Sequence, residues 1–455
     1  MGTLYRTWIH PRVRRPSQRE EIEVTESSAA RRSAYTRLMQ THDVVVIGAG
    51  LAGLRCAAEL AARGREVVVL EATDRVGGRQ RTDRVDGFTL DRGFHVLNTA
   101  YPAVRASVDV NRLAVRSFPT AVRVRRADGS MTTLGHPLRH PYLLPATLAS
   151  GFVKPRDLAA LLRWLGPIAL RPRVAVTRAD RTVGEGWDAA GMTGPLRTEV
   201  LGPFFSGVLA DATESTSDTY VRLLARSFLP AGAGLPQEGI GVLPRALASR
   251  ARAAGADIRV GRAVSRLRRR ENRWEVRALG EGRLLARDVV VAVGAEALDV
   301  LLDVPAPATR GLQTWWFAAE EAPASAVLTL DGTREGPIVN SLAISDTIPQ
   351  AAPRGRHLIQ ATCLWAPERV ATEHEVRAQL SRMWGHASVS WELLRRDDIP
   401  YALPALPPPM RRPSPARIGD GLHLAGDHRE TPSIQGALLS GMRAAKSVLA
   451  TPTRG

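Results

Sequence analysis

A glycine-rich stretch constrains the fold of this 455-residue chain more than any other feature of the sequence. The stretch reads Asp43-Val-Val-Val-Ile-Gly48-Ala-Gly50-Leu-Ala-Gly53, and an Ala-rich segment follows it. Gly48 permits a tight turn from a buried strand into a helix, Gly50 leaves room for a pyrophosphate beside the backbone, and Gly53 lets helix and strand pack closely. We therefore predict a dinucleotide-binding βαβ unit at this point in the chain.

An acidic residue completes the predicted unit. A second apolar run, residues 66–70, has the pattern of the next strand, and Glu71 ends it at the spacing where an acid binds ribose hydroxyls. The helix between the two strands offers free N–H groups and a partial positive charge to the phosphates. The unit alone does not distinguish FAD from NAD.

The rest of the chain continues to alternate between strand and helix patterns. Strands are predicted over residues 258–264, 274–278, 288–293 and 421–425, a helix over 434–449, and a hairpin at Arg268-Arg269-Arg270-Glu271. Pro-rich, Trp-bearing segments separate these blocks, so we expect an α/β fold with a discontinuous cofactor domain and an inserted α+β substrate domain. The cofactor domain is expected to comprise residues 42–110, 236–300 and 415–455, and the substrate domain residues 111–235 and 301–414.

Residues 1–41 mix arginines and glutamates without a sustained apolar period, so we expect a disordered N-terminal extension. The segment lacks the apolar core of a secretory signal, and its glutamates argue against a transit peptide. Met39 stands four residues before the first expected strand, so a start site placed too far upstream explains the segment equally well. Whether residues 1–38 belong to the native protein stays open.

Two further motifs carry a resemblance to a known family. They are Arg75-Val76-Gly77-Gly78-Arg79, shortly after Glu71, and Leu424-Ala425-Gly426-Asp427 near the other end of the chain. With them the chain resembles the FAD-dependent amine oxidase and phytoene desaturase superfamily, whose FAD-binding Rossmann domain is glutathione-reductase-like. The resemblance implies that the first motif lies along the pyrophosphate and flavin, and that Asp427 contacts the ribityl–pyrophosphate region. It also implies that the helix at Ser433-Ile434-Gln435-Gly436-Ala437 points its N-terminus at the flavin N1–O2 edge, where negative charge develops on reduction.

The resemblance reaches into the middle of the chain. Asp91-Arg92-Gly93-Phe94-His95-Val96-Leu97 is similar to a segment that runs beside the isoalloxazine in the desaturase-like branch. By the same resemblance, Val264 contacts the adenine through its backbone and Ala292 closes the sheet beside the cofactor. The residues expected to bind FAD, without a covalent link, are Gly48, Gly50, Leu51, Ala52, Gly53, Glu71, Ala72, Arg75, Gly77, Gly78, Arg79, Gly93, Phe94, His95, Val264, Ala292, Gly426, Asp427, Ser433, Ile434, Gln435 and Ala437.

His95 is the best candidate for a catalytic acid–base residue, because the resemblance implies a place near the flavin ring. A hydrogen-bonded structural role for this histidine is the alternative. An apolar substrate cavity could be lined by Trp315, Trp316 and Trp365, or these residues could pack in the core. Because neighbouring residues on a strand face opposite ways, at most one of Trp315 and Trp316 faces such a cavity.

The lysines bear on the substrate. Amine oxidases of this superfamily usually carry a lysine near flavin N5, expected at about residues 300–320, but Lys154 and Lys446 are the only lysines. This departure favours an FAD-dependent oxidoreductase that dehydrogenates a largely apolar small molecule at a carbon–carbon or similar bond. A flavin amine oxidase, a non-redox flavin-dependent isomerase or mutase, and a flavin-free binding module are the alternatives. The substrate, the electron acceptor and the oligomeric state do not follow from the sequence.

Charge and composition limit the partners. The formal charge is +17, but the basic residues are nearly all arginines mixed with acids, so we expect a solvated surface and no nucleic-acid binding. No uncharged apolar run is long enough to span a membrane. The basic, apolar stretch Arg156–Arg171 is expected to form a lid or core helix or, alternatively, to rest on a membrane surface. Cys56 and Cys363 are too few for a disulfide framework or a metal cluster, which fits a cytoplasmic protein.

Overall fold

The computed structural model of the protein describes residues 39–136, 139–170, 179–228, 233–321, 325–410 and 413–450. The extension expected over residues 1–38 lies outside the described part of the chain. Residues 39–41, which the sequence assigned to the same extension, instead begin strand β1 (Met39–Ile47). They belong to the strand because their backbone pairs in parallel with residues 283–285.

The first large sheet is parallel in its centre and antiparallel at one edge. Its strands are, in spatial order, β10 (Asp257–Arg259), β2 (Val67–Leu70), β1, β13 (Arg283–Val291), β12 (Arg273–Ala278) and β11 (Val264–Arg270), with β20 (Leu422–Leu424) also on β13 and β19 (Arg417–Gly419) on β20. The central strands are apolar runs buried on both faces, as parallel strands require. All the predicted strands except 258–264 are confirmed, and β13 begins five residues earlier than predicted.

The strand predicted over residues 258–264 is wrong. The strand β10 ends at Arg259 and β11 begins at Val264, because the chain reverses between a parallel and an antiparallel strand. Gly261 makes the reversal with a φ of +66°, and its N–H donates to the carbonyl oxygen of Thr73 at 2.7 Å. The hairpin predicted around Glu271 joins β11 to β12 and is confirmed.

Three helices cover one face of this sheet, α2 (Leu51–Ala61), α10 (Val242–Ala253) and α14 (Ile434–Leu449). The last of them has the predicted bounds. Side chains alternate along β1: Val46 packs among these helices, whereas Val45 packs on the other face with Val276 of β12. The second face is therefore covered by side chains of β11 and β12, which continue the same sheet at its antiparallel edge, and by α11 (Leu298–Leu302).

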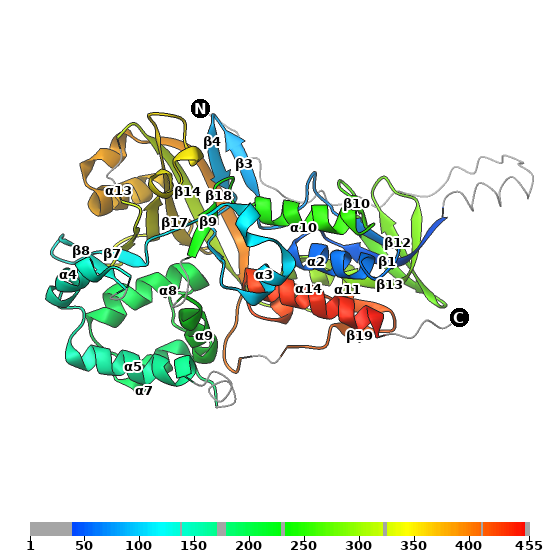
Figure 1. Ribbon diagram of the computed structural model, residues 1–455, viewed down its shortest axis with the longest axis horizontal. Helices are drawn as coiled ribbons and strands as arrows, with labels where there is room; N and C mark the ends of the chain where they lie inside the picture. Colours follow the sequence, from blue (N-terminus) through cyan, green and yellow to red (C-terminus); the bar gives the residue numbers. More distant parts are fainter. Residues whose placement is uncertain are drawn as a thin grey trace, which may run out of the picture.

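A second sheet and a group of helices lie at the other end of the molecule (Figure 1). The strands are, in spatial order, β18 (Glu392–Pro404), β14 (Thr309–Ala319), β17 (His357–Trp365), β16 (Ile338–Ala343), β15 (Leu328–Asp331), β7 (Ala121–Arg125) and β8 (Met131–Gly135). The helices are α13 (Glu373–Trp384) on the sheet and, below it in the view, α4 (Leu144–Ala149), α5 (Pro155–Leu170), α7 (Val183–Ala190), α8 (Gly202–Leu209) and α9 (Asp218–Phe228).

Short elements lie between the two large sheets in Figure 1. They are the hairpin of β3 (Thr82–Val85) and β4 (Phe88–Asp91), the small sheet of β5 (Leu97–Asn98), β9 (Ala233–Pro236) and β6 (Val115–Ser117), and the helix α3 (Pro102–Ser107). The short helix α12 (Ile344–Thr347) packs against β17 of the second sheet. The strands of the two large sheets come from alternating stretches of the chain. The division into an FAD-binding and a substrate domain at the boundaries given above stays a prediction.

Trp315 and Trp316 lie next to each other on β14 and point to opposite faces of the second sheet. Trp315 packs with Phe317 and Trp391, whereas Trp316 packs with Leu90. The two sets of neighbours confirm that the rings face opposite ways. Both indole rings are buried, and Trp316 also borders a small pocket beside Leu235 and Ile344.

Candidate functional site

The glycine loop joins β1 to α2, and two of its three glycines have no room for a side chain. Gly48 has a φ of +101°, and a Cβ there would lie 2.6 Å from the carbonyl oxygen of Ala292. A Cβ at Gly53 would lie 2.0 Å from the carbonyl oxygen of Gly48. At Gly50, by contrast, nothing lies within 4 Å of the Cβ position. The space beside Gly50 is where the resemblance implies a pyrophosphate, so the loop fits that group.

Glu71 stands at the end of β2 with its carboxylate turned toward the glycine loop. Its Oε2 accepts a hydrogen bond from the backbone N–H of Ala49 at 2.8 Å. Its Oε1 accepts from the backbone N–H and the hydroxyl of Thr73 at 3.0 and 2.6 Å. The side chain of Arg81 lies 3.6 Å from the same oxygen. Since a carboxylate accepts about four hydrogen bonds, capacity remains for a ribose hydroxyl.

The second glycine motif packs directly on the first. The N–H of Gly77 donates to the carbonyl oxygen of Ala49 at 2.9 Å, and a Cβ on Gly78 would lie 3.3 Å from the Cα of Gly50. Gly77 and Gly78 have positive φ values of +128° and +58°. Glycine adopts such values readily, whereas a β-branched residue would have a strained backbone there. The two motifs therefore surround the same space.

Arg79 links this region to the far end of the chain. Its Nη2 donates to Oδ1 of Asp427 at 2.6 Å, and its Nη1 donates to the carbonyl oxygen of Ala402 in β18 at 2.7 Å. Asp427 is only 5% exposed, whereas the side chain of Arg79 is 33% exposed. Burial lowers the pKa of Arg79, but the charge and hydrogen bond of Asp427 outweigh it and raise that pKa above its usual value. This contact brings together two motifs that the sequence placed 348 residues apart.

The first turn of α14 begins directly after Pro432. Ser433 caps the helix, because its Oγ accepts from the N–H of Gly436 at 3.0 Å. Gln435 Oε1 accepts from the N–H of Ala103 at 2.9 Å, which ties the helix start to α3. Ile434 and Ala437 lie in the same first turn. The N-terminus of this 16-residue helix carries the partial positive charge that suits an electron-rich ring edge.

The segment 91–97 lies against the second sheet. A Cβ on Gly93 would lie 2.5 Å from Cδ1 of Ile399 in β18. The N–H of Phe94 donates to the hydroxyl of Thr314 in β14 at 3.3 Å. This segment is therefore held against β14 and β18 of the second sheet.

His95 is held by its own segment. Its Nε2 lies 3.0 Å from the carbonyl oxygen of Arg92, which can only accept, so Nε2 carries the proton and Nδ1 the lone pair. Burial lowers the pKa of His95 to about 4, and the positive charge of Arg79 acts in the same direction. The imidazole is therefore neutral at neutral pH, which removes the role of a general acid and leaves a weak base.

Other predicted site residues lie around the glycine loop or turn away from it. The N–H of Ala292 donates to the carbonyl oxygen of Ile47 at 2.8 Å, beside the loop. Val264 begins β11, at the end of the reversal that hydrogen-bonds to Glu71 and Thr73. Arg75 pairs with Asp83 of β3, away from the phosphate space. Leu51 and Ala52 are buried in α2, whereas Ala72, directly after Glu71, is exposed. The N–H of Gly426 donates to the hydroxyl of Ser440 at 3.0 Å. Their roles toward FAD stay predictions.

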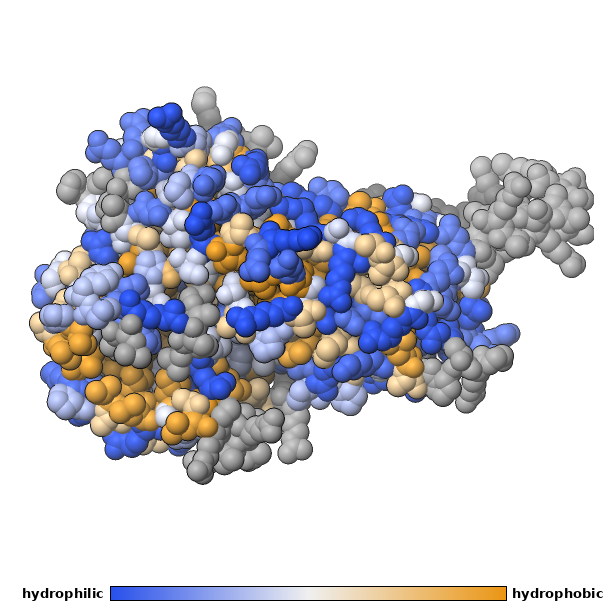
Figure 2. All heavy atoms as spheres, viewed as in Figure 1, coloured by the Kyte–Doolittle hydropathy of each residue, from blue (hydrophilic) through white to orange (hydrophobic). Residues whose placement is uncertain are grey.

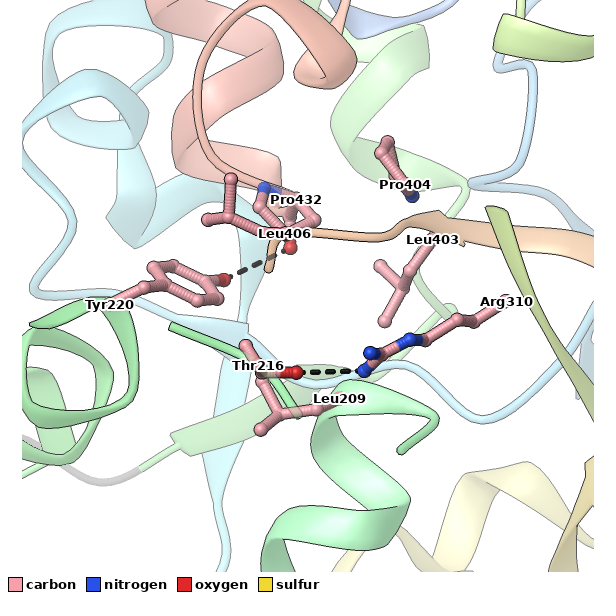
Figure 3. A pocket seen from close by; sticks show the side chains of 8 residues that line it. All are labelled: Leu209, Thr216, Tyr220, Arg310, Leu403, Pro404, Leu406 and Pro432. Atoms are coloured by element: carbon pink, nitrogen blue, oxygen red, sulfur yellow. Dashed lines mark hydrogen bonds between the residues drawn. The ribbon is translucent and has the colours of Figure 1, made fainter. Parts of the chain in front are cut away.

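A small pocket lies where the helices, the second sheet and the start of α14 meet (Figure 3). Tyr220 of α9 donates its hydroxyl to the carbonyl oxygen of Pro432 at 3.1 Å. Arg310 of β14 donates to the hydroxyl of Thr216 at 2.7 Å and forms an ion pair with Asp211, also at 2.7 Å. The remaining lining residues are apolar: Leu209, Leu403, Pro404 and Leu406. The pocket therefore combines an apolar wall with a buried phenol whose pKa is raised by burial.

Reasoning from the sequence missed the pocket and part of the hydrogen-bonding around Glu71. Tyr220 and Arg310 lie on separate elements with no local motif, so only their tertiary contact identifies them. Thr73 and Arg81 contact Glu71 only through the fold around the end of β2, and no pattern in the sequence marks them.

The cysteines and charged clusters offer little further chemistry. Cys56 in α2 and Cys363 in β17 are buried, and burial raises the pKa of both thiols. Cys363 is 0% exposed and packs in the core of the second sheet. Among the described residues, no three His, Cys, Asp or Glu side chains are grouped to hold a metal ion. None of the helices in the described ranges has the length and apolar character needed to cross a bilayer.

Comparison with known proteins identifies a family. The family model for flavin containing amine oxidoreductase matches residues 51–449. A phytoene dehydrogenase of Streptomyces griseus is 31% identical over 258 residues, 50% of either protein. A putrescine oxidase of Kocuria rosea is 51% identical over 67 residues, 15% of this chain and 14% of the oxidase. The chain thus spans half or less of the length of these curated relatives.

The fold has relatives among solved structures. The crystal structure of an oxidoreductase from Methanosarcina mazei superimposes with a TM-score of 0.72 at 20% identity, covering 89% of this chain and 100% of that one. A putrescine oxidase bound to putrescine superimposes with a TM-score of 0.65 at 18% identity, covering 91% and 100%. At these identities the likeness concerns the fold alone.

Proposed function

The chain belongs to the family of flavin-containing amine oxidoreductases, and from this premise we propose that it oxidises a largely apolar small molecule at carbon. The family makes it an FAD-dependent oxidoreductase. The substrate is the part proposed, because the matched relatives are named both as desaturases or dehydrogenases and as an amine oxidase.

The apolar wall around the small space at Pro432, which in this structure has room for about one water molecule, is the observation behind this proposal. Most of its lining is aliphatic, and no Asp or Glu is among the residues that form its wall. The nearby Asp211 is already paired with Arg310, so it is not free to hold a substrate ammonium. Burying an alkylammonium there would cost more than burying a hydrocarbon of the same size. The positions of Lys154 and Lys446, both outside β14, support the same conclusion.

The residues proposed to hold FAD are those gathered around the two glycine motifs. The space at Gly50 would receive the pyrophosphate, Glu71 the ribose hydroxyls, and Asp427 the ribityl–pyrophosphate region. Ser433 fixes the start of α14, whose N-terminal charge would stabilise the reduced ring. When bound, FAD supplies the hydride acceptor for the oxidation. The protein itself orients the substrate and excludes water from the pocket.

Replacing Glu71 by alanine is expected to weaken FAD binding by about 1–3 kcal/mol, the range for losing a hydrogen bond to a charged group. The flavin reduction potential should stay nearly unchanged, since the ribose lies far from the ring. Isothermal titration of the FAD-free protein, with the potential measured separately, tests both statements. A large change in potential at unchanged affinity would contradict the role given to Glu71.

His95 is proposed to position the segment beside the ring rather than to transfer a proton. His95→Ala should therefore slow anaerobic flavin reduction by less than about tenfold, whereas removal of an acid–base group typically costs about 10²–10⁴-fold. His95→Asn, which can still donate to the carbonyl of Arg92, should restore part of the rate. A loss above 10²-fold with no recovery in His95→Asn would establish a proton-transfer role instead.

The low pKa of His95 also predicts a pH dependence of stability. The unfolded histidine titrates near its ordinary value of about 6.5, whereas the native one stays neutral down to about 4. As the pH falls through this window the unfolded state takes up the proton first, so the free energy of unfolding should decrease. Urea unfolding at pH 7 and pH 4.5 should show a smaller decrease in His95→Asn. A residual decrease is expected from His428, whose pKa burial also lowers to about 4.

A screen of anaerobic flavin bleaching tests the proposed substrate class. Apolar isoprenoids, porphyrinogens and steroids are compared with primary amines and polyamines. Bleaching by an apolar compound supports the proposal, and rapid bleaching by amines alone would establish an amine oxidase. Turnover without stoichiometric consumption of reducing equivalents would instead indicate an isomerase or mutase.

A further inference from the structure

The outer surfaces of α4 and α5 expose a group of large apolar side chains. The group comprises Tyr142, Leu144, Leu148, Leu158, Leu162 and Leu170, each between 39% and 83% exposed. Figure 2 shows apolar residues gathered at the lower left, where Figure 1 draws these helices. An exposed apolar group of this kind marks a surface that contacts something other than water.

The two faces of α5 have separate uses. Ala160, Trp164 and Ile168 are buried, and Trp164 packs against rings of α7 and α8. Leu158 and Leu162 are four residues apart and therefore share the outer face, one turn above the other. The core thus accounts for the inner face of the helix but leaves these two leucines unexplained.

The exposed charges between residues 139 and 170 have one sign, whereas α7, which packs against the inner face of α5, carries the exposed acids Glu185 and Asp188. Between residues 139 and 170 the basic residues are Arg139, Lys154, Arg156 and Arg163, and the only acid is Asp157. Asp157 is 1% exposed and lies on the inner face. Lys154, Arg156 and Arg163 are exposed. The outer surface is therefore apolar and cationic, which complements anionic lipid headgroups above an acyl-chain boundary.

We propose that this outer surface of α4 and α5 docks the protein on a membrane that contains anionic lipids. The leucines enter the interface between headgroups and acyl chains, and the basic side chains contact the headgroups. The interaction is reversible, because two short helix faces bury a limited apolar area. A protein partner would be expected to place acids opposite the basic residues and to leave pure lipid vesicles unbound.

The docking surface and the pocket belong to one packed unit. The apolar cluster around Trp164 and Trp187 also contains Leu209, Tyr220 and Leu406, which line the pocket. If the membrane holds the apolar substrate, α5 touches the bilayer with its outer face and packs with its inner face on the cluster that includes the pocket residues Leu209 and Tyr220. This last connection rests on the proposed function, whereas docking itself does not.

Sedimentation of the FAD-loaded full chain with vesicles tests the proposal. Vesicles of phosphatidylcholine alone are compared with vesicles that contain about one third phosphatidylserine. The wild type should bind the anionic vesicles at least tenfold more tightly, and high salt should weaken this binding. The double variant Leu158→Ser/Leu162→Ser should bind vesicles at least tenfold more weakly than the wild type. The double variant Lys154→Gln/Arg163→Gln should lose at least tenfold in affinity for the anionic vesicles only.

The matched control changes exposed apolar residues elsewhere. Leu279 and Val300 are 70% and 76% exposed, and Leu279→Ser with Val300→Ser should bind vesicles like the wild type. FAD content and melting temperature establish that each variant is folded. Equal binding by wild type and Leu158→Ser/Leu162→Ser, or no binding to either vesicle, overturns the proposal. A dimer that these two substitutions dissociate would assign the surface to a second copy instead. None of these results depends on finding the substrate.

Discussion

Replacing Gly50 by valine is expected to yield a folded protein that purifies without FAD. Nothing lies within 4 Å of the Cβ position at Gly50, and its φ of −74° is open to any residue, so we expect the substitution to leave folding intact. Its methyl groups would fill the space proposed for the pyrophosphate, which binds only where the backbone can be approached closely. The absorbance spectrum of the purified variant and its circular dichroism measure the two parts of this expectation.

A control for Gly50→Val comes from Gly166, which lies in α5 and also has no atom within 4 Å of its Cβ position. Gly166→Val should keep the wild-type FAD content. A Gly53→Ala variant should behave differently from both, because its Cβ would meet the Gly48 carbonyl oxygen at 2.0 Å and oppose folding itself. Normal FAD content in Gly50→Val would show that the pyrophosphate lies elsewhere.

Removing Arg79 is expected to cost more stability than removing any exposed arginine. Arg79→Ala leaves the carboxylate of Asp427, 5% exposed, without its cation, and also frees the carbonyl of Ala402. Breaking a buried pair costs about 3–5 kcal/mol, and the partial exposure of Arg79 favours the lower end. Urea unfolding of the FAD-free protein should therefore show a loss of about 3 kcal/mol.

A double variant separates the charge from the packing. Adding Asp427→Asn to Arg79→Ala removes the unpaired charge and should recover part of the lost stability. Arg417→Ala is the control, since Arg417 pairs with Asp420 on the surface and should contribute less than about 1 kcal/mol. Equal losses in Arg79→Ala and Arg417→Ala would mean that the buried pair contributes no more than a surface pair.

Local patterns predicted the framework of the fold, because the features that form it are themselves local. An apolar run marks a central strand wherever it occurs, and the glycine spacing of residues 48–53 specifies a strand-to-helix turn. The strand predicted over 258–264 failed for the opposite reason. Its continuity depended on Gly261, whose positive φ turns the chain toward β11.

The site could be predicted only where its residues stand in motifs. Glu71 and Asp427 belong to such motifs, but the bond from Arg79 to Asp427 is a tertiary contact. Tyr220 and Arg310 come from elements with no pattern of their own, so the pocket was out of reach of the sequence. His95 was identified as a candidate acid–base group, yet the burial that lowers its pKa to about 4 depends on the folded environment.

The link between Arg79 and Asp427 also has a consequence for biosynthesis. The two residues are 348 positions apart, so a ribosome adding about 5–20 residues per second needs roughly 20–70 s to pass from one to the other. During that time the nascent chain carries the glycine loop without α14, and the apolar side of α2 that this helix covers is exposed to chaperones. With FAD bound as proposed, we expect the cofactor to load only after α14 is made, and a chain truncated before Asp427 to purify colourless.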